Sequence, residues 1–117
     1  MKKIFHLSSC NTCQRILKEL DAENRGITLQ DIKVQNVSAE ELDAMAKETG
    51  SYEALFSRRA MKFRSMGLNE MDLTEQDYRK YILEEYTFLK RPVMWIEGEL
   101  FVGNTKKVVA AAQEKLG

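Results

Sequence analysis

Cys10-Asn11-Thr12-Cys13 is the stretch on which the interpretation of this chain depends, because it holds both of its cysteines. An apolar run at 4–7 precedes it, and apolar residues at helical spacing follow it. This pattern predicts a strand that passes directly into a helix at the cysteine pair. The unpaired amides and the dipole of such a helix start would stabilise a thiolate at Cys10, and Cys13 is near enough to close a disulfide with it.

Three interpretations of the cysteine pair are open: a redox-active dithiol, two buried structural thiols, or half of a zinc site. Structural zinc usually needs two further ligands, and His6 is the one other soft donor, so the sequence argues against a metal site. In a reducing compartment, such a pair is more often catalytic or redox-sensing than structural. We therefore take Cys10 as the candidate nucleophile and Cys13 as the thiol that would resolve a mixed disulfide formed on it.

The composition is that of a soluble globular chain: 117 residues, 44% hydrophobic and 31% charged. Basic and acidic residues number 18 each, so the overall charge does not point to nucleic acid or to an anionic membrane as a partner. No N-terminal apolar stretch is long enough for a signal peptide or a membrane span. We therefore expect a cytoplasmic protein, and a monomer, since nothing demands an oligomer.

Hydrophobic periodicity predicts an order of β-α-β, then several helices, then β-β-α. Ser38 and Glu41 match the Ser-x-x-Glu pattern of a capping box, and Glu97-Gly98 between two apolar runs is a hairpin signal. This order indicates a single α/β domain over 1–117, with a mixed sheet interrupted by a helical insertion. The expected elements are strands at 2–8 and 27–34, helices at 12–23, 38–50 and 74–89 with two short helices between the last two, strands at 93–96 and 99–102, and a last helix after 105.

The chain resembles the ArsC/Spx family, which holds arsenate reductases coupled to glutaredoxin or glutathione and Spx-type transcriptional regulators. The resemblance is carried by a strand ending in Cys-x-x-Cys, by His6 four residues before Cys10, and by Leu-Lys-Arg-Pro-Val at 89–93 before the hairpin. It implies a thioredoxin-like fold with a central all-helical insertion. The thioredoxin-like part would comprise 1–37 and 88–117, and the insertion would span about 38–87.

The resemblance also implies roles for single residues. Cys10 would be the nucleophile, and His6 would help to lower the pKa of that cysteine. Cys13 stands where Spx-type proteins have their second cysteine. Arg91 would belong to an oxyanion site, and Pro92 would be the cis-proline that faces the active cysteine.

Further substrate contacts are expected from Arg59, Asn11 and Thr12. Arg59 aligns with an arginine of Spx-type proteins and lies in a run of basic residues. Asn11 and Thr12 lie between the cysteines, where the first turn of the predicted helix offers unpaired amides to an anion.

Two functions follow from the resemblance. The first is a thiol-dependent oxidoreductase of the arsenate reductase family, in which Cys10 attacks an oxyanion or a disulfide. Cys13 or glutathione would resolve the intermediate, with glutathione, glutaredoxin or thioredoxin as reductant and no bound cofactor. The alternative is an Spx-type redox-sensing regulator that binds the RNA polymerase α-subunit. Ser57 and Gly103 stand where the reductases have arginines, and Gln14 stands where the Spx group often has one.

Overall fold

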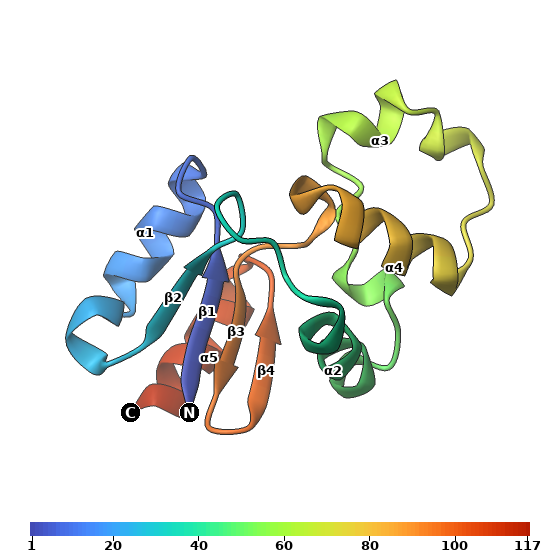
Figure 1. The fold of residues 1–117 in the computed structure, drawn as a ribbon. Coiled ribbons are helices and arrows are strands. Elements are labelled where there is room, and N and C mark those ends of the chain that lie inside the picture. The colour runs from blue at the N-terminus through green and yellow to red at the C-terminus, as the bar shows by residue number, and fades with distance from the viewer. The chain divides into compact units, whose positions relative to one another are not determined.

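The computed structural model describes residues 1–117, and the chain forms two compact units (Figure 1). The first unit comprises residues 1–35 and 91–117, and the second comprises residues 36–90. The first contains a β-sheet with helices, whereas the second is built from helices. No helix has both the length and the apolar character needed to cross a membrane.

The first unit is a four-stranded mixed sheet with two α-helices. Its elements are β1 (Lys2–His6), α1 (Asn11–Glu19), β2 (Thr28–Asp31), β3 (Val93–Ile96), β4 (Glu99–Val102) and α5 (Lys106–Leu116). The strand order is β2-β1-β3-β4. β1 pairs in parallel with β2 and antiparallel with β3, and β3 pairs antiparallel with β4. The predicted α/β class with a mixed sheet is therefore confirmed.

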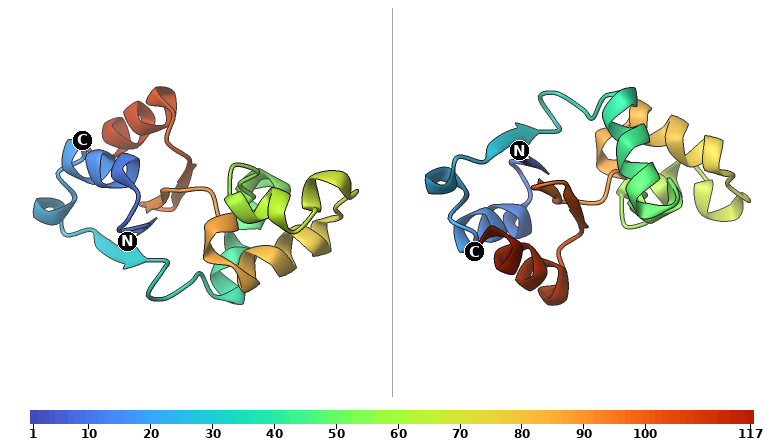
Figure 2. Two further views of the ribbon diagram at one scale, coloured as in Figure 1. Left: turned by 90° about the horizontal axis from the view of Figure 1, so that it is seen from above. Right: turned by 90° about the horizontal axis from the view of Figure 1, so that it is seen from below.

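Both helices of this unit pack against one face of the sheet, as Figure 2 shows. Ile4 of β1 pairs with Met94 of β3, and Met94 pairs with Phe101 of β4, so these three side chains share a face. Ile16 of α1 and Ala112 of α5 join them in one buried cluster. Burial of this apolar face fixes α1 on the sheet and thereby fixes the position of its first residues.

α1 is shorter than the helix predicted for residues 12–23. The N–H of Leu20 donates to the Ile16 carbonyl oxygen at the end of the helix, and Asp21 then adopts a left-handed backbone with φ of 52°. A residue in that conformation cannot continue a right-handed helix. A separate 3₁₀ helix, Ala22–Arg25, follows, so the predicted end of the helix is wrong.

The turn between β3 and β4 consists of Glu97 and Gly98, as predicted from the sequence. Both residues have left-handed backbones, with φ of 47° and 84°. Positive φ at both central residues is the mark of a type I′ turn, whose twist matches that of the strands it joins. The hairpin therefore closes with the shortest usual connection.

The second unit contains three α-helices and three short 3₁₀ helices. They are α2 (Ala39–Thr49), α3 (Met61–Ser65) and α4 (Glu75–Glu84), with 3₁₀ helices at Glu53–Leu55, Leu68–Glu70 and Tyr86–Phe88. The predicted capping box opens α2, since Ser38 Oγ accepts from the Glu41 N–H at 3.0 Å and the Glu41 carboxylate accepts from the Ser38 N–H at 2.9 Å. The helix predicted to reach residue 89 instead ends at Glu84, because Glu85 is extended with φ of −139°.

Phe56 lies at the centre of an aromatic cluster in the second unit. Its side chain is fully buried, and its ring centroid lies 5.9 Å from Phe63, 4.9 Å from Tyr78 and 5.0 Å from Phe88. Such separations are typical of favourable aromatic pairs. Tyr78 and Phe88, both buried, thus belong with Phe56 to the core of this unit.

Candidate active site

Cys10 occupies the position directly before α1, in the turn that leaves β1. Its N–H donates to the Leu7 carbonyl oxygen at 3.0 Å, and its own carbonyl oxygen accepts from the Gln14 N–H at 3.1 Å. Its backbone is extended, with φ of −93° and ψ of 108°, and its side chain is partly exposed. The Cys10 side chain therefore lies at a helix N-terminus, where a thiolate is stabilised and a substrate can reach it.

The surroundings of Cys10 favour its thiolate. Burial alone would raise the pKa of the Cys10 thiol, but hydrogen bonds from the backbone and side chain of Cys13 and from Arg91 outweigh it. The positive charge of Arg91 acts in the same direction, so the pKa of Cys10 lies below its ordinary value. A larger fraction of Cys10 is therefore ionised at neutral pH than of a free cysteine.

The surroundings of Cys13, in contrast, disfavour its thiolate. Its side chain is 0% exposed on the inner face of α1. Burial raises the pKa of Cys13 to about 12, with the hydrogen bond and charge of Cys10 adding to the rise and the Leu7 amide opposing it. Both cysteines are free, and no group of three or more His, Cys, Asp or Glu side chains is placed to hold a metal ion. The pair thus combines a Cys10 thiol whose ionisation is favoured with a Cys13 thiol that stays protonated at neutral pH and donates to it.

Arg91 reaches Cys10 through the pairing of β1 with β3. Phe5 of β1 lies opposite Val93 of β3 in an antiparallel register, so the segment that enters β3 runs beside the end of β1. The Arg91–Pro92 peptide bond is cis, as the resemblance implies. Arg91 therefore acts on Cys10 although the two residues are far apart in the sequence.

His6 is held as a neutral ring, and not as the cation that would help to ionise Cys10. It lies at the end of β1 with 9% of its surface exposed. Burial lowers the pKa of His6, and the negative charge of Asp31 only partly opposes this. A neutral imidazole adds no positive charge, so Arg91 and the start of α1 supply the charge that stabilises Cys10.

The remaining predicted site residues fall into two groups. Asn11 and Thr12 form the start of α1 next to Cys10, where Asn11 is exposed and Thr12 is half-buried. Arg59 is exposed and lies just before α3, in the second unit. The first unit therefore brings the cysteines together with Arg91 and the helix start, and Arg59 is not part of that unit.

Two side chains at this turn were not predicted from the sequence. Gln14 Nε2 donates to the Leu7 carbonyl oxygen at 3.1 Å. Asp31, which pairs with His6 across β1 and β2, accepts from the Ser8 N–H at 3.3 Å. Adjacency to the cysteine pair was a sequence signal for Gln14, whereas the position of Asp31 depends on strand register, which no local pattern reveals.

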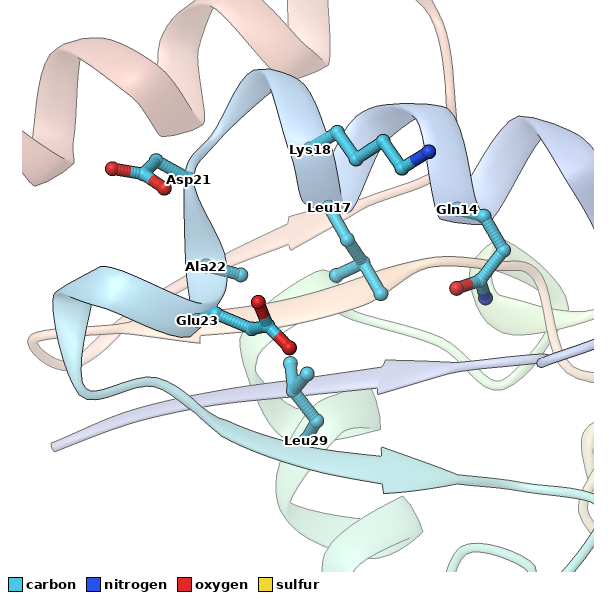
Figure 3. Close-up of a pocket in the computed structure, with 7 residues that line it drawn as sticks. All are labelled: Gln14, Leu17, Lys18, Asp21, Ala22, Glu23 and Leu29. Carbon is cyan, nitrogen blue, oxygen red and sulfur yellow. The ribbon is translucent and has the colours of Figure 1, made fainter.

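A hollow of about 310 Å³ lies along α1 and β2 (Figure 3). Apolar side chains form the floor of the hollow, and charged side chains form its rim. Cys10 is not among the lining residues. The lining residues are Gln14, Leu17, Lys18, Asp21, Ala22, Glu23 and Leu29. The reactive sulfur therefore lies outside this hollow, and Gln14 borders both regions.

We expect Arg91→Gln to raise the pKa of Cys10, because it removes a hydrogen bond and a positive charge from the thiolate. Below that pKa the rate of alkylation follows the thiolate fraction, so a rise of about one in pKa slows alkylation at neutral pH roughly tenfold. The rate is measured with iodoacetamide as a function of pH, with mass spectrometry to locate the label. Only Cys10 should be labelled in the folded protein, since Cys13 is fully buried.

Arg15→Gln is the matched control for this experiment. The Arg15 side chain lies on the solvent side of α1 with 63% of its surface exposed, and the substitution removes the same charge. It should leave the alkylation profile of Cys10 unchanged. An identical profile in Arg91→Gln and wild type would show that Arg91 does not stabilise the thiolate.

Solved structures share this fold. The YFFB (PA3664) protein superimposes with a TM-score of 0.82 at 24% identity, covering 97% of this chain and 99% of that one. An arsenate reductase (ArsC) related protein from Brucella melitensis superimposes with a TM-score of 0.68 at 26% identity, covering 94% and 92%. The thioredoxin-like fold predicted for the chain is therefore confirmed.

Sequence comparisons agree with the structural ones. The global transcriptional regulator Spx 2 of Bacillus anthracis is 26% identical over 105 residues, which cover 88% of this chain and 79% of that protein. The sequence model of the ArsC family matches residues 5–112, which include both cysteines, Arg91 and the whole second unit. By this match over nearly the whole chain, the protein belongs to the ArsC family.

Proposed function

We propose that the protein is a thiol-dependent oxidoreductase of the arsenate reductase type, with Cys10 as its nucleophile. One observation carries the proposal: the Cys10 sulfur lies at the start of α1 and receives hydrogen bonds from Cys13 and Arg91 that favour its thiolate. A stabilised and accessible thiolate is the group that attacks disulfides and other electrophiles.

In the first step, the Cys10 thiolate attacks the substrate. With a disulfide, a new S–S bond forms to Cys10 and the other half leaves as a thiolate. With arsenate, an S–As bond forms and one arsenate oxygen leaves as water after protonation. Arg91 would neutralise the incoming negative charge, and Asn11 and Thr12 would contact the remainder of the substrate.

In the second step, Cys13 attacks the sulfur of Cys10. Once Cys10 is bonded to the substrate, it no longer carries the negative charge that helps to raise the pKa of Cys13. The Leu7 amide and Arg91 still favour the Cys13 thiolate, so its ionisation becomes easier at the moment when it is needed. The attack forms a Cys10–Cys13 disulfide and releases a thiolate, or arsenite when the two electrons reduce As(V) to As(III).

Glutathione can replace Cys13 in this step, because its thiolate attacks the Cys10 sulfur and forms a mixed disulfide with Cys10. A second glutathione then attacks the bound glutathione sulfur, so that Cys10 leaves as a thiolate and oxidised glutathione is released. Glutaredoxin, glutathione or thioredoxin would supply the two electrons that return the protein disulfide to the dithiol. The cycle therefore needs no bound cofactor. All of the redox equivalents pass through thiols.

The proposal is tested by turnover of arsenate, and of a small disulfide, in the presence of glutathione and glutaredoxin. We expect oxidised glutathione to form with at least one of the two substrates, and release of arsenite identifies arsenate as a substrate. Absence of turnover with both substrates, in protein whose Cys10 is alkylated rapidly at neutral pH, would refute an enzymatic role.

The similarity to Spx 2 supports a second candidate. In it, Cys10 and Cys13 act as a redox switch that controls binding to the α-subunit of RNA polymerase. The test is capture of the C-terminal domain of that subunit by the reduced and by the oxidised protein. Binding in one redox state alone, together with absent turnover, would favour the regulator, and failure to bind in either state would exclude it.

A further inference from the structure

The side-chain amide of Gln14 makes two contacts beneath the turn that carries Cys10. Its Nε2 donates to the Leu7 carbonyl oxygen at 3.1 Å and lies 3.3 Å from Nδ1 of His6. Gln14 follows Cys13 on α1 and is half-buried, and in Figure 3 its amide points from the helix toward the strands. The proposed catalytic chemistry makes no use of this amide.

The Leu7 carbonyl fixes which end of the amide faces His6. A carbonyl oxygen only accepts hydrogen bonds, so the amide atom beside it must be the NH₂ nitrogen, which has two protons to donate. One proton points at Leu7, and the other is available to His6 Nδ1 at 3.3 Å. Nδ1 must then be the acceptor, and the proton of the neutral ring resides on Nε2.

Leu7 connects this contact to both cysteines. Its carbonyl oxygen also accepts from the Cys10 N–H at 3.0 Å. Its own N–H makes a hydrogen bond to the Cys13 sulfur. Gln14 therefore holds the residue whose carbonyl oxygen contacts Cys10 and whose N–H contacts Cys13.

We propose that Gln14 is a positioning residue of the Cys10 site: it keeps His6 in the neutral Nε2–H form and braces the turn from Leu7 to Cys10. The inference rests on the proposed function in taking Cys10 as the nucleophile. Asp31 on β2 is the charged group that acts on His6, and its negative charge favours a protonated ring. The Gln14 donor opposes this, because a proton on Nδ1 would place two donors against each other.

The protonation state of His6 is directly measurable, because His6 is the single histidine of the chain. Its ring ¹⁵N chemical shifts report the titration midpoint and distinguish the two neutral tautomers. Three substitutions separate the possible causes. Gln14→Leu removes the donor, Gln14→Glu replaces it with an acceptor of the same size, and Gln14→Lys keeps a donor nitrogen.

We expect wild type and Gln14→Lys to hold His6 as the Nε2–H tautomer at neutral pH. Gln14→Glu should raise the pKa of His6 by about one or more, because a carboxylate beside Nδ1 stabilises the imidazolium. Gln14→Leu should show a mixture of tautomers and a midpoint between those of wild type and Gln14→Glu. A purely structural role for Gln14 would not place the His6 titration midpoint of Gln14→Leu between those of wild type and Gln14→Glu.

The bracing of the turn is tested by hydrogen exchange of the Cys10 amide. Loss of one hydrogen bond to the Leu7 carbonyl group should speed this exchange roughly two- to tenfold in Gln14→Leu. Arg15→Leu is the matched control, because it places the same side chain at the next position on the exposed side of α1. It should change neither the exchange rate nor the His6 signals.

The outcomes separate this inference from the proposed function. Unchanged His6 tautomer and midpoint in both Gln14→Leu and Gln14→Glu would overturn the role of Gln14 at His6, and unchanged Cys10 exchange would overturn the bracing. Neither measurement requires turnover. If wild type shows no turnover while His6 responds as expected, the proposed enzyme function fails and the role of Gln14 at His6 is supported.

Discussion

Cys10→Ser is expected to reduce turnover of a disulfide or of arsenate to the background rate measured without protein. A serine hydroxyl is almost entirely un-ionised at neutral pH, and it cannot form the disulfide through which the electrons pass. The fold should survive, because serine is close in size to cysteine and is among the preferred residues at a helix N-cap. The measurement is the glutathione and glutaredoxin assay, with circular dichroism to verify folding.

Cys13→Ser is the matched control for this loss. It keeps the Cys10 nucleophile and retains a hydroxyl donor beside it, but it removes the resolving thiol. Mixed with oxidised glutathione, Cys13→Ser should accumulate one glutathione adduct on Cys10, visible in the intact mass, whereas Cys10→Ser should carry none. Turnover by Cys10→Ser at the wild-type rate would show that Cys10 is not the nucleophile.

Phe56→Ala is expected to lower the free energy of unfolding by about 3–5 kcal/mol, because it removes a fully buried ring and leaves a cavity. The loss also breaks the contacts of Phe56 with Phe63, Tyr78 and Phe88. Domains are typically stable by only about 5–15 kcal/mol, so this single change removes a large share of the total. The measurement is urea denaturation followed by far-ultraviolet circular dichroism.

Met61→Ala is the control within the same unit. The Met61 side chain is 90% exposed, so its truncation should change the free energy of unfolding by less than about 0.5 kcal/mol. The single tryptophan, Trp95, lies on β3 in the first unit, and its fluorescence gives a separate record of that unit. A loss below about 1 kcal/mol for Phe56→Ala would contradict a central role for its ring in the core.

Much of the fold was predictable because its signals are local. The capping residues Ser38 and Glu41 lie three apart and identify the start of α2 directly. Glu97-Gly98 between two apolar runs identifies the hairpin, because few residues accept the backbone that a two-residue turn requires. The predicted helix ends at 23 and 89 were wrong, since they depended on the backbone of Asp21 and of Glu85, and apolar spacing does not report backbone conformation.

The candidate site was predictable in part. Cys10 and Cys13 are neighbours on one helix turn, so their proximity follows from the sequence pattern. The protonation state of His6 was not predictable in this way. The resemblance implied that His6 helps to ionise Cys10, but burial of the ring lowers the pKa of His6 and favours its neutral form.

The cysteine motif, the helix it begins and the mixed order of strands and helices are all encoded in short stretches of the chain, where each residue interacts with near neighbours. The positive charge that stabilises the Cys10 thiolate is not encoded in a short stretch of the sequence. Arg91 acts on that sulfur because β1 pairs with β3, and Cys13 stays protonated because the packed sheet buries it. A pKa depends on the distance to distant charges and on the loss of water, and both quantities exist only after the chain has folded.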